Sequence, residues 1–291
     1  MVQNESGETS QLVVDDRWVT PLSARPPLRE YLKSLVSLQP YIWRDAAGQA
    51  FTSGQNTYLG RLWVFLNPLL QVSVFALVFG VLLKTSRGVD NFLGFLTIGV
   101  IFFGFMSAGI TKGPTLVKGS QGLLRSFDFP GAILSLSLTV RAALDNAIPA
   151  ALAVLMALAF QWTSPVSWTV VLVIPLYILM HIFIAGCALI TSRIGAFIPD
   201  FKSVVSVVMR GLFFLSGIFY DIQRFDDKPI LRDIMSVNPI YQFLAAFREV
   251  VLTGDLPSIG RWGYLLLWAF GLFAGGLIFV WRGEPRYKSV R

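Results

Sequence analysis

Long apolar runs separated by short polar stretches fill most of the chain after about residue 62. A hydrocarbon core of about 30 Å requires about 20 mainly apolar residues in a helix. Runs of about this length or longer lie at about 62–83, 91–111, 131–160, 168–191, 203–220 and 262–281. The pattern predicts six transmembrane helices within a transmembrane domain at 61–282. The 131–160 run exceeds one crossing, so we expect it to tilt or to extend into the cytosol.

Two further segments are amphipathic and too short to span. The first, at 27–38, is expected to begin at Pro27, to end near Pro40 and to lie in the inner membrane interface. Its apolar positions at helical spacing are Leu28, Tyr31, Leu32, Leu35 and Val36. Residues 45–58 are then expected to form a loose connector. The second, at about 238–252, is expected to belong to an interfacial or re-entrant pair of helices.

Composition and charge support a membrane protein and indicate its orientation. Hydrophobic residues make up 54% of the chain and charged residues 14%, which excludes an ordinary soluble domain. Lys and Arg concentrate in the segments that are inside when the amino terminus is inside, so both termini are expected in the cytosol. The tails 1–26, expected to be disordered, and 283–291 would then be cytosolic. Nucleic-acid binding is the competing explanation for the net charge of +7, and the scatter of the charges over loops disfavours it.

The start of the first predicted span is polar and interrupted by a proline. Arg61 and Trp63 suit the boundary between water and lipid, where they would fix the depth of the helix. Asn67-Pro68 removes a backbone donor and is expected to bend the helix, leaving room beside it. An anchored helix with a simple packing kink is an equally good interpretation.

Aromatic residues are frequent in the first two predicted spans. They include Phe65, Phe75, Phe102 and Phe105. An aromatic ring can stack on the C–H groups of a sugar without holding any single hydroxyl, so these side chains could line a path for glycans. Packing against lipid or neighbouring helices is the alternative.

Few ionisable residues fall inside the predicted spans. Arg141 and Asp145 are four residues apart and are expected to form an ion pair on one helix face. Arg210 lies about 12 Å along its helix from Lys202 and has no acid within helical reach. An arginine in this setting is a functional candidate that faces a watery path or an anion. Pairing with Asp145 or with a carbonyl of another helix is the alternative, and His181 is expected to serve packing or a local hydrogen bond.

Two loops carry further signals. The inner loop 112–130 mixes charged and apolar residues and ends at a proline, which predicts a short amphipathic helix that a partner covers. A helix lying on the membrane surface is the alternative. The outer segment 221–261 has helix starts near Pro229 and Pro239 and a stop at Gly254. Two short helices there would form a lid over the outer mouth.

Motifs of independent chemistry are absent from the sequence. There is no Gly-Lys-Ser/Thr phosphate loop, histidine pair, cysteine cluster or nucleophile elbow. Asp145 is the only carboxylate within the predicted spans, which argues against a proton-coupled carrier with an acidic relay. The chain is therefore expected to be a transport subunit without catalytic residues, metal or cofactor of its own.

Several short motifs lie in a characteristic order. They are Leu59-Gly-Arg-Leu-Trp63, Asn67-Pro-Leu-Leu70, Phe129-Pro130, Phe219-Tyr220, and Asn238-Pro239 followed by Arg248. Over about 27–285 this order resembles the permease subunits of ABC-2 type exporters of polysaccharides or polyol phosphates (O-antigen, teichoic acid, galactan), the Wzm and TagG class. The resemblance implies an all-α integral membrane protein with six spans, an interfacial helix, a cytosolic coupling helix and outer gate helices.

The resemblance also implies partners and site residues. A homodimer in the bacterial inner or plasma membrane would sit on two copies of a separate ATPase, which binds ATP and Mg²⁺, and would export a polysaccharide linked to polyprenyl diphosphate. Contact with the ATPase would involve Lys118, Leu123, Leu124, Arg125, Phe127, Asp128, Phe129 and Pro130. Access of the lipid-linked glycan would involve Tyr31, Arg61, Trp63, Asn67 and Pro68. The channel would be lined by Phe65, Phe75, Phe102, Phe105, Arg210 and Tyr220. The outer gate would include Pro229, Asn238, Pro239, Tyr241 and Arg248.

The chain departs from this family in two places. A long neutral connector follows Arg44-Asp45, where family members commonly have a short basic link, which counts against capture of the lipid diphosphate by that link. Ser216-Gly217 stands where many members have Ser-Pro, which predicts a less rigid end of the fifth span. Three alternatives remain: an ABC-2 exporter of a drug or small amphiphilic lipid, a membrane glycosyltransferase or acyltransferase, and a scaffold that would not stimulate a partner ATPase. The single histidine disfavours a transferase.

Overall fold

The computed structural model describes residues 26–52, 62–78, 91–120, 130–161 and 165–287. Helices account for the regular structure of these residues, and no strand is assigned among them. The helices are α1 (Leu28–Ser37), α2 (Gln39–Thr52), α3 (Trp63–Ala76), α4 (Phe92–Lys112), α5 (Leu116–Gly119), α7 (Ala132–Ala159), α8 (Val173–Phe197), α9 (Phe201–Leu215), α10 (Pro229–Val237), α11 (Pro239–Arg248) and α12 (Ile259–Tyr287). Short 3₁₀ turns cover Gly113–Thr115, Trp168–Leu172 and Ile222–Phe225, and a π-helical turn covers Glu249–Thr253.

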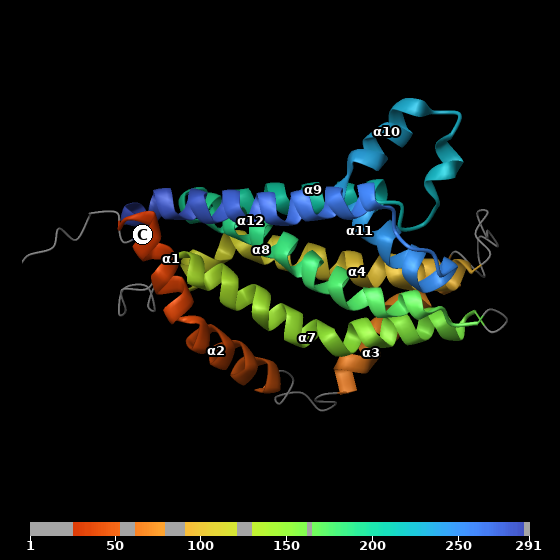
Figure 1. The fold of residues 1–291 in the computed structure, drawn as a ribbon, viewed down its shortest axis with the longest axis horizontal. Coiled ribbons are helices and arrows are strands. Elements are labelled where there is room, and N and C mark those ends of the chain that lie inside the picture. The colour runs from red at the N-terminus through yellow and green to blue at the C-terminus, as the bar shows by residue number, and fades with distance from the viewer. Residues whose placement is uncertain (1–25, 53–61, 79–90, 121–129, 162–164, 288–291) are drawn as a thin grey trace, which may run out of the picture.

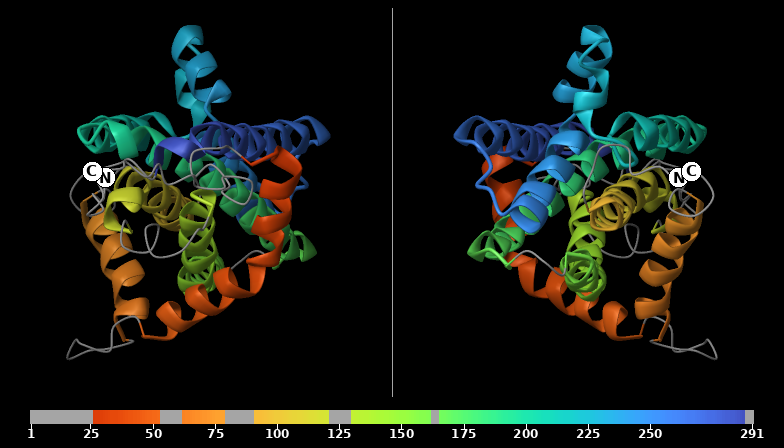
Figure 2. Two further views of the ribbon diagram at one scale, coloured as in Figure 1. Left: turned by 90° about the vertical axis from the view of Figure 1, so that its left-hand side faces the viewer. Right: turned by 90° about the vertical axis from the view of Figure 1, so that its right-hand side faces the viewer.

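The long helices form a bundle whose members run side by side (Figure 1). α8 contacts α4, α7 and α12. We call the end of the bundle that carries α1 and the last turns of α12 the α1 end, and the opposite end, with α10 and α11, the α10 end. In both end views α10 stands clear of the other helices (Figure 2).

Four of the predicted spans are confirmed as helices that are long and apolar enough to cross a membrane. They cover Phe92–Gly119, Ala132–Ala159, Trp168–Phe197 and Ile259–Pro285. The first predicted span is described only as far as residue 78. The fifth is shorter than predicted, because α9 ends at Leu215 and the chain turns at Gly217, which has a φ of 61°.

The segment after α1 differs from the prediction. A loose connector was expected over 45–58, but α2 continues as helix to Thr52, and residues 53–58 lie outside the described part. The first helix was expected over 27–38 with its end near Pro40, and α1 does end at Ser37. Pro40 itself is the second residue of α2, where its missing N–H would have no helical partner. The break between the two helices falls at Leu38. Ile42 and Ala46 are buried, and α2 packs along α7.

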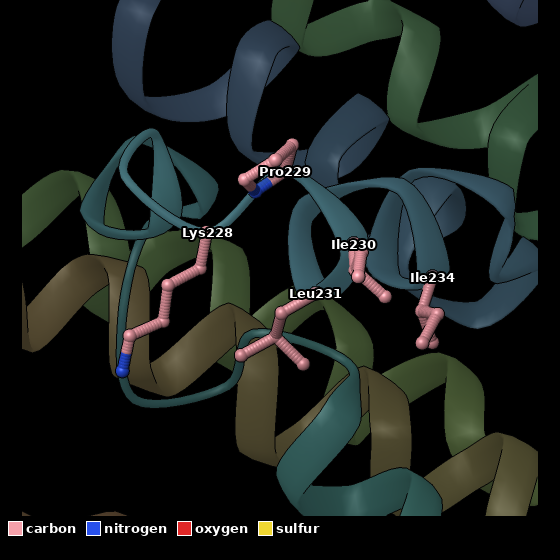
Figure 3. A pocket seen from close by; sticks show the side chains of 5 residues that line it. All are labelled: Lys228, Pro229, Ile230, Leu231 and Ile234. Atoms are coloured by element: carbon pink, nitrogen blue, oxygen red, sulfur yellow. The ribbon is translucent and has the colours of Figure 1, made fainter.

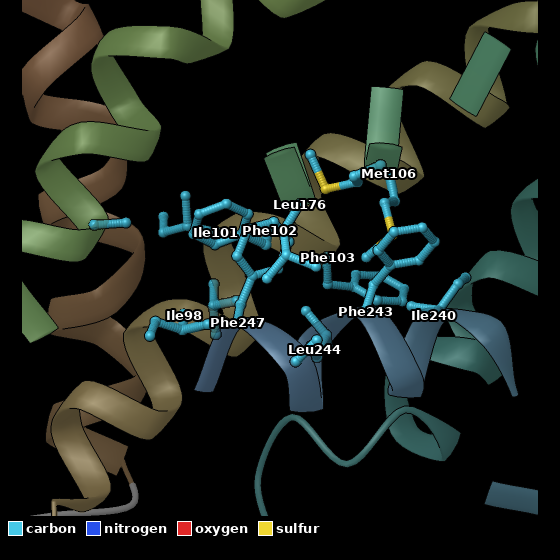
Figure 4. Packing of buried hydrophobic residues seen from close by; sticks show 14 of the residues in the cluster. Ile98, Ile101, Phe102, Phe103, Met106, Leu176, Ile240, Phe243, Leu244 and Phe247 are labelled. Carbon is cyan, nitrogen blue, oxygen red and sulfur yellow. The ribbon is translucent and has the colours of Figure 1, made fainter. Parts of the chain in front are cut away.

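The main core joins α4, α8 and α11. The rings of Phe102 and Phe247 lie 4.1 Å apart between centroids, and those of Phe183 and Phe243 lie 5.4 Å apart. Figure 4 shows side chains of α4 and α11, including Phe102, Phe243 and Phe247, gathered between the two helices. The core therefore fixes the short helix α11 against two long helices.

Two glycines bring α8 and α12 together. A Cβ atom on Gly186 would lie 2.5 Å from the Leu272 carbonyl carbon, and one on Gly276 would lie 2.9 Å from the Gly186 oxygen. Between membrane helices, where burial from water contributes little, such close backbone contact supplies van der Waals attraction. Any side chain at either position would force the two helices apart.

Candidate functional site

Arg248 is the centre of a buried polar cluster at the α10 end. Its guanidinium donates hydrogen bonds to the backbone oxygens of Phe95 (3.3 Å), Gly217 (2.9 Å) and Ile218 (3.4 Å). It also lies 3.4 Å from the centroid of the Phe95 ring, in a cation–π contact. The side chain is 6% exposed. Arg248 therefore ties α11 to α4 and to the turn that follows α9.

Asn238 binds the same turn. Its side-chain oxygen accepts a hydrogen bond from the Ile240 N–H (3.0 Å) and so caps α11. Its amide donates to the Ser216 hydroxyl (2.9 Å). Two residues expected at an outer gate, Asn238 and Arg248, thus converge on residues 216–218, which the sequence did not reveal. We call residues 216–218 the α9 turn.

The other outer residues divide into exposed and buried groups. Tyr241 is 8% exposed and lies against the α9 turn, where a Cβ on Gly217 would be 3.2 Å from its ring. Pro239 begins α11 and Pro229 begins α10, which confirms the two predicted helix starts, and Gly254 ends the second helical segment with a φ of 76°. Pro229 is exposed.

An open hollow lies along α10. Its volume is ≈ 340 Å³, and Figure 3 shows the side chains that line it, namely Lys228, Pro229, Ile230, Leu231 and Ile234. The lining is apolar except for Lys228. Such a surface suits apolar contact, because specific recognition of a polar ligand needs several convergent polar groups.

Arg210 lies on the outward face of α9. The buried face of this helix carries Val205 and Met209 and contacts α4, whereas Arg210 is exposed beside Val207. Among the described residues, Arg210 makes no hydrogen bond or ion pair that the structure identifies. The alternative pairing with Asp145 is not formed, because Asp145 binds Arg141 at 3.4 Å, as the four-residue spacing predicted.

The aromatic residues expected along a path occupy different environments. Phe102 is 0% exposed within one chain, so its ring has no surface left to line a channel, and this prediction is corrected. Phe105 is half-buried, 5.6 Å from the Phe102 ring. Phe75 is half-buried and packs 5.4 Å from Phe219, and Tyr220 donates its hydroxyl to the Phe214 oxygen. The side chain of Phe65 lies outside the described part.

The residues expected to admit a lipid-linked glycan do not share one surface. Trp63 and Asn67 are exposed, Pro68 is buried within a continuous α3, and Arg61 lies outside the described residues. Tyr31 is 2% exposed and points inward, with its hydroxyl 3.1 Å from the Glu284 carboxylate. Its placement in an access site is therefore corrected, because a buried phenol already paired inside the chain offers a ligand no contact.

The expected coupling loop is described only at its two ends. Lys118 is exposed on α5, and Pro130 is buried at the start of α7. Leu123, Leu124, Arg125, Phe127, Asp128 and Phe129 lie outside the described residues. Sequence reasoning missed Glu284, whose hydrogen bonds reach this loop's exit. The sequence feature that could have identified Glu284 is its position: it is a carboxylate in the last turns of an apolar helix, where the helix dipole favours cations.

Potential metal ligands do not cluster in the described ranges. Within them, no three His, Cys, Asp or Glu side chains gather closely enough to hold a metal ion. His181 forms the expected local hydrogen bond, with Nδ1 2.9 Å from the Tyr177 oxygen.

Comparisons with known proteins identify relatives over most of the chain. It is 23% identical over 239 residues to the O-antigen export system permease protein RfbA of Myxococcus xanthus, covering 81% of this chain and 87% of the relative. It is also 23% identical to the Klebsiella pneumoniae protein of the same name, covering 69% and 76%. The polysialic acid transport protein KpsM of Escherichia coli is 23% identical over 79% and 89%.

A family model agrees with these relatives. The ABC-2 type transporter family matches residues 47–252, which include α3 to α11. Together with four apolar helices of spanning length, the match indicates a multi-pass membrane protein. The chain belongs to the ABC-2 type transporter family.

Proposed function

We propose that the chain is the permease subunit of an ATP-driven exporter that moves a polysaccharide on a polyprenyl diphosphate carrier out of the cytosol. The observation that carries this proposal is the similarity to O-antigen and polysialic acid export proteins over most of both chains. The α1 end would face the cytosol and the α10 end the outside. A polyol-phosphate polymer is the related substrate class.

The exposed face of α9 supports a path between two copies of the chain. Val204, Val207 and Arg210 are exposed there. An arginine facing hydrocarbon is costly, so such residues face water, a partner or an anion. A homodimer that pairs these faces would give Arg210 a hydrated path, in which its charge would attract the diphosphate of the passing lipid.

The predicted access site on α3 and the predicted gate segment 221–261 would form the two ends of this path. Exposed Trp63 and Asn67 on α3 would border the opening through which the carrier lipid comes in. The segment 221–261 would close the outer mouth, with Asn238 and Arg248 anchoring it to the α9 turn.

Energy would come from two copies of a separate ATPase that binds ATP and Mg²⁺. The ATPase would bind the loop 118–130, because the first and last residues of this loop lie at the α1 end of the bundle. Hydrolysis would then alternate the path between inward and outward access.

The test is depletion of this protein followed by mass spectrometry of extracted polyprenyl-diphosphate-linked glycans. We expect one long glycan to accumulate, and re-expression of the wild-type chain to clear it. A control strain depleted of a later step in the same glycan's assembly would distinguish blocked export from a downstream arrest. Absence of accumulation, with an ATPase still bound, would refute glycan export and favour a small amphiphile.

A further inference from the structure

Three distant segments meet through Tyr31 and Glu284 at the α1 end. The Tyr31 hydroxyl donates to one oxygen of the Glu284 carboxylate (3.1 Å), and the other oxygen accepts from the Gly131 N–H (2.7 Å). The Ala132 N–H donates to the Tyr31 oxygen (3.3 Å). The interfacial helix α1, the end of α12 and the start of α7 are thereby joined by one hydrogen-bonded network, which we call the α1 junction.

The network caps α7, which has no cap of its own. The first N–H groups of a helix lack partners within it, and side chains or water must accept from them. Pro130 has no N–H, and no side chain next to the start of α7 accepts a hydrogen bond from it. Tyr31 and Glu284 supply the two acceptors instead, and the carboxylate also lies at the positive end of the helix dipole.

The residues that flank the 118–130 loop are buried in the same apolar cluster as Tyr31. Val117 before the loop is 2% exposed, Ala132 after it is 0% exposed, and both pack in a cluster with Tyr31 and Val280. A second bond ties α12 to the start of α1, because the Trp281 indole N–H donates to the Pro26 oxygen (2.8 Å). A displacement at the loop's exit must therefore move α1 or break these contacts.

We infer that Tyr31 and Glu284 are positioning residues that transmit movement at the loop's exit to the interfacial helix α1. This inference rests on the proposed function, in which an ATPase moves the 118–130 loop. ATP binding would then shift α1 in the membrane surface in step with α7. The hydrogen bonds of the α1 junction form a continuous network through which movement at the loop's exit can reach α1.

The experiment uses the permease purified with its ATPase and reconstituted in vesicles. A lipid-sensitive fluorophore would be attached at Val36→Cys, since Val36 on α1 is 69% exposed, in a Cys187→Ala background that removes the single native cysteine. The emission change on adding ATP and the ATP hydrolysis rate would be measured on the same sample. We expect a clear emission change in this parent protein.

Variants of the junction should uncouple these two readouts. Removing a hydrogen bond to a charged group changes the equilibrium constant between two conformations roughly tenfold. We therefore expect Tyr31→Phe and Glu284→Ala to reduce the ATP-induced emission change about tenfold. ATP hydrolysis and complex assembly should persist. Glu284→Gln keeps an oxygen that can accept from Gly131 and should restore part of the response. Tyr177→Phe is the matched control, because it removes a phenol that donates to the Ala143 oxygen, away from the junction.

Each alternative outcome has a separate meaning. Without any ATPase in the purified complex, the proposed function fails and the inference falls with it. With active ATPase and no emission change in the parent, the proposed function stands and movement of α1 is refuted. Junction variants that respond like the parent would also refute the inference. If Glu284→Ala fails to fold, Tyr31→Phe and Glu284→Gln still decide the result.

Discussion

A methyl group added at Gly99 should open the Arg248 cluster. Gly99 lies on α4, and a Cβ there would be 2.5 Å from a terminal guanidinium nitrogen of Arg248 and 3.3 Å from the Ile218 oxygen. Real Cβ atoms do not approach so closely, so in Gly99→Ala the guanidinium must move. It would then lose its bond to Ile218 in the α9 turn, one of the contacts that hold α11 against the bundle.

The size of the effect follows from the bonds that are lost. The displaced nitrogen donates to the Phe95 and Ile218 oxygens, and hydrogen bonds to charged groups contribute about 1.5–3 kcal/mol each. Alanine regains up to about 1 kcal/mol over glycine through helix propensity. The net loss is about 2–5 kcal/mol, which corresponds to a fall in Tm of roughly 3–8 °C for a chain of this size.

Gly104→Ala on the same helix is the matched control, since a Cβ there meets nothing within 4 Å. Thermal unfolding in detergent, followed by intrinsic fluorescence, should give a lower Tm for Gly99→Ala and an equal or higher Tm for Gly104→Ala. In an Arg248→Met background the effect of Gly99→Ala should shrink, because the clashing nitrogen is gone. Equal Tm values for the two alanine variants, or an unchanged effect in that background, would refute the reasoning.

Further substitutions address α8, α11 and α9. Gly195→Ala should lower the Tm by a similar amount, because its Cβ would collide with the Pro114 backbone, and an unchanged Tm would contradict this packing. Asn238→Ala should cost about 1–2 kcal/mol through loss of a helix cap and a buried bond, measured as a lower Tm, whereas Asn238→Asp should keep the cap; equal losses would show that capping contributes nothing. Arg210→Ala should lower glycan export several-fold without loss of ATPase binding, while Lys202→Ala on the same helix should export normally. Unchanged export in Arg210→Ala would remove this side chain from the path.

Much of the fold could be predicted from local patterns along the sequence. The long apolar runs gave the four spanning helices because length and hydropathy suffice to identify them. The four-residue spacing of Arg141 and Asp145 gave their ion pair, since only one helix is involved. Pro229 and Pro239 indicated helix starts, because the N–H that proline lacks would have no partner in the first turn of a helix.

The remaining features depend on contacts between distant segments. Pro40 carries the same local signal whether it ends one helix or begins another, and only the packing of α2 on α7 decides between them. Burial of Phe102 and Tyr31 depends on which helix faces each ring, which a periodicity of 3.6 does not specify. Arg248 and Glu284 bind backbone groups 30 or more residues away. Every residue has such backbone groups, so the sequence does not indicate which of them will be bound.

The seam of Gly186 and Gly276 has a consequence for engineering. Because the two backbones pack closely there, the contact between α8 and α12 at Gly186 and Gly276 forms a fixed frame that tolerates almost no added side chain. α9 and α10 instead carry most of their side chains outward and have few neighbours to disturb. Mutant libraries that seek a different transported substrate should therefore vary α9 and α10 and leave Gly186 and Gly276 unchanged.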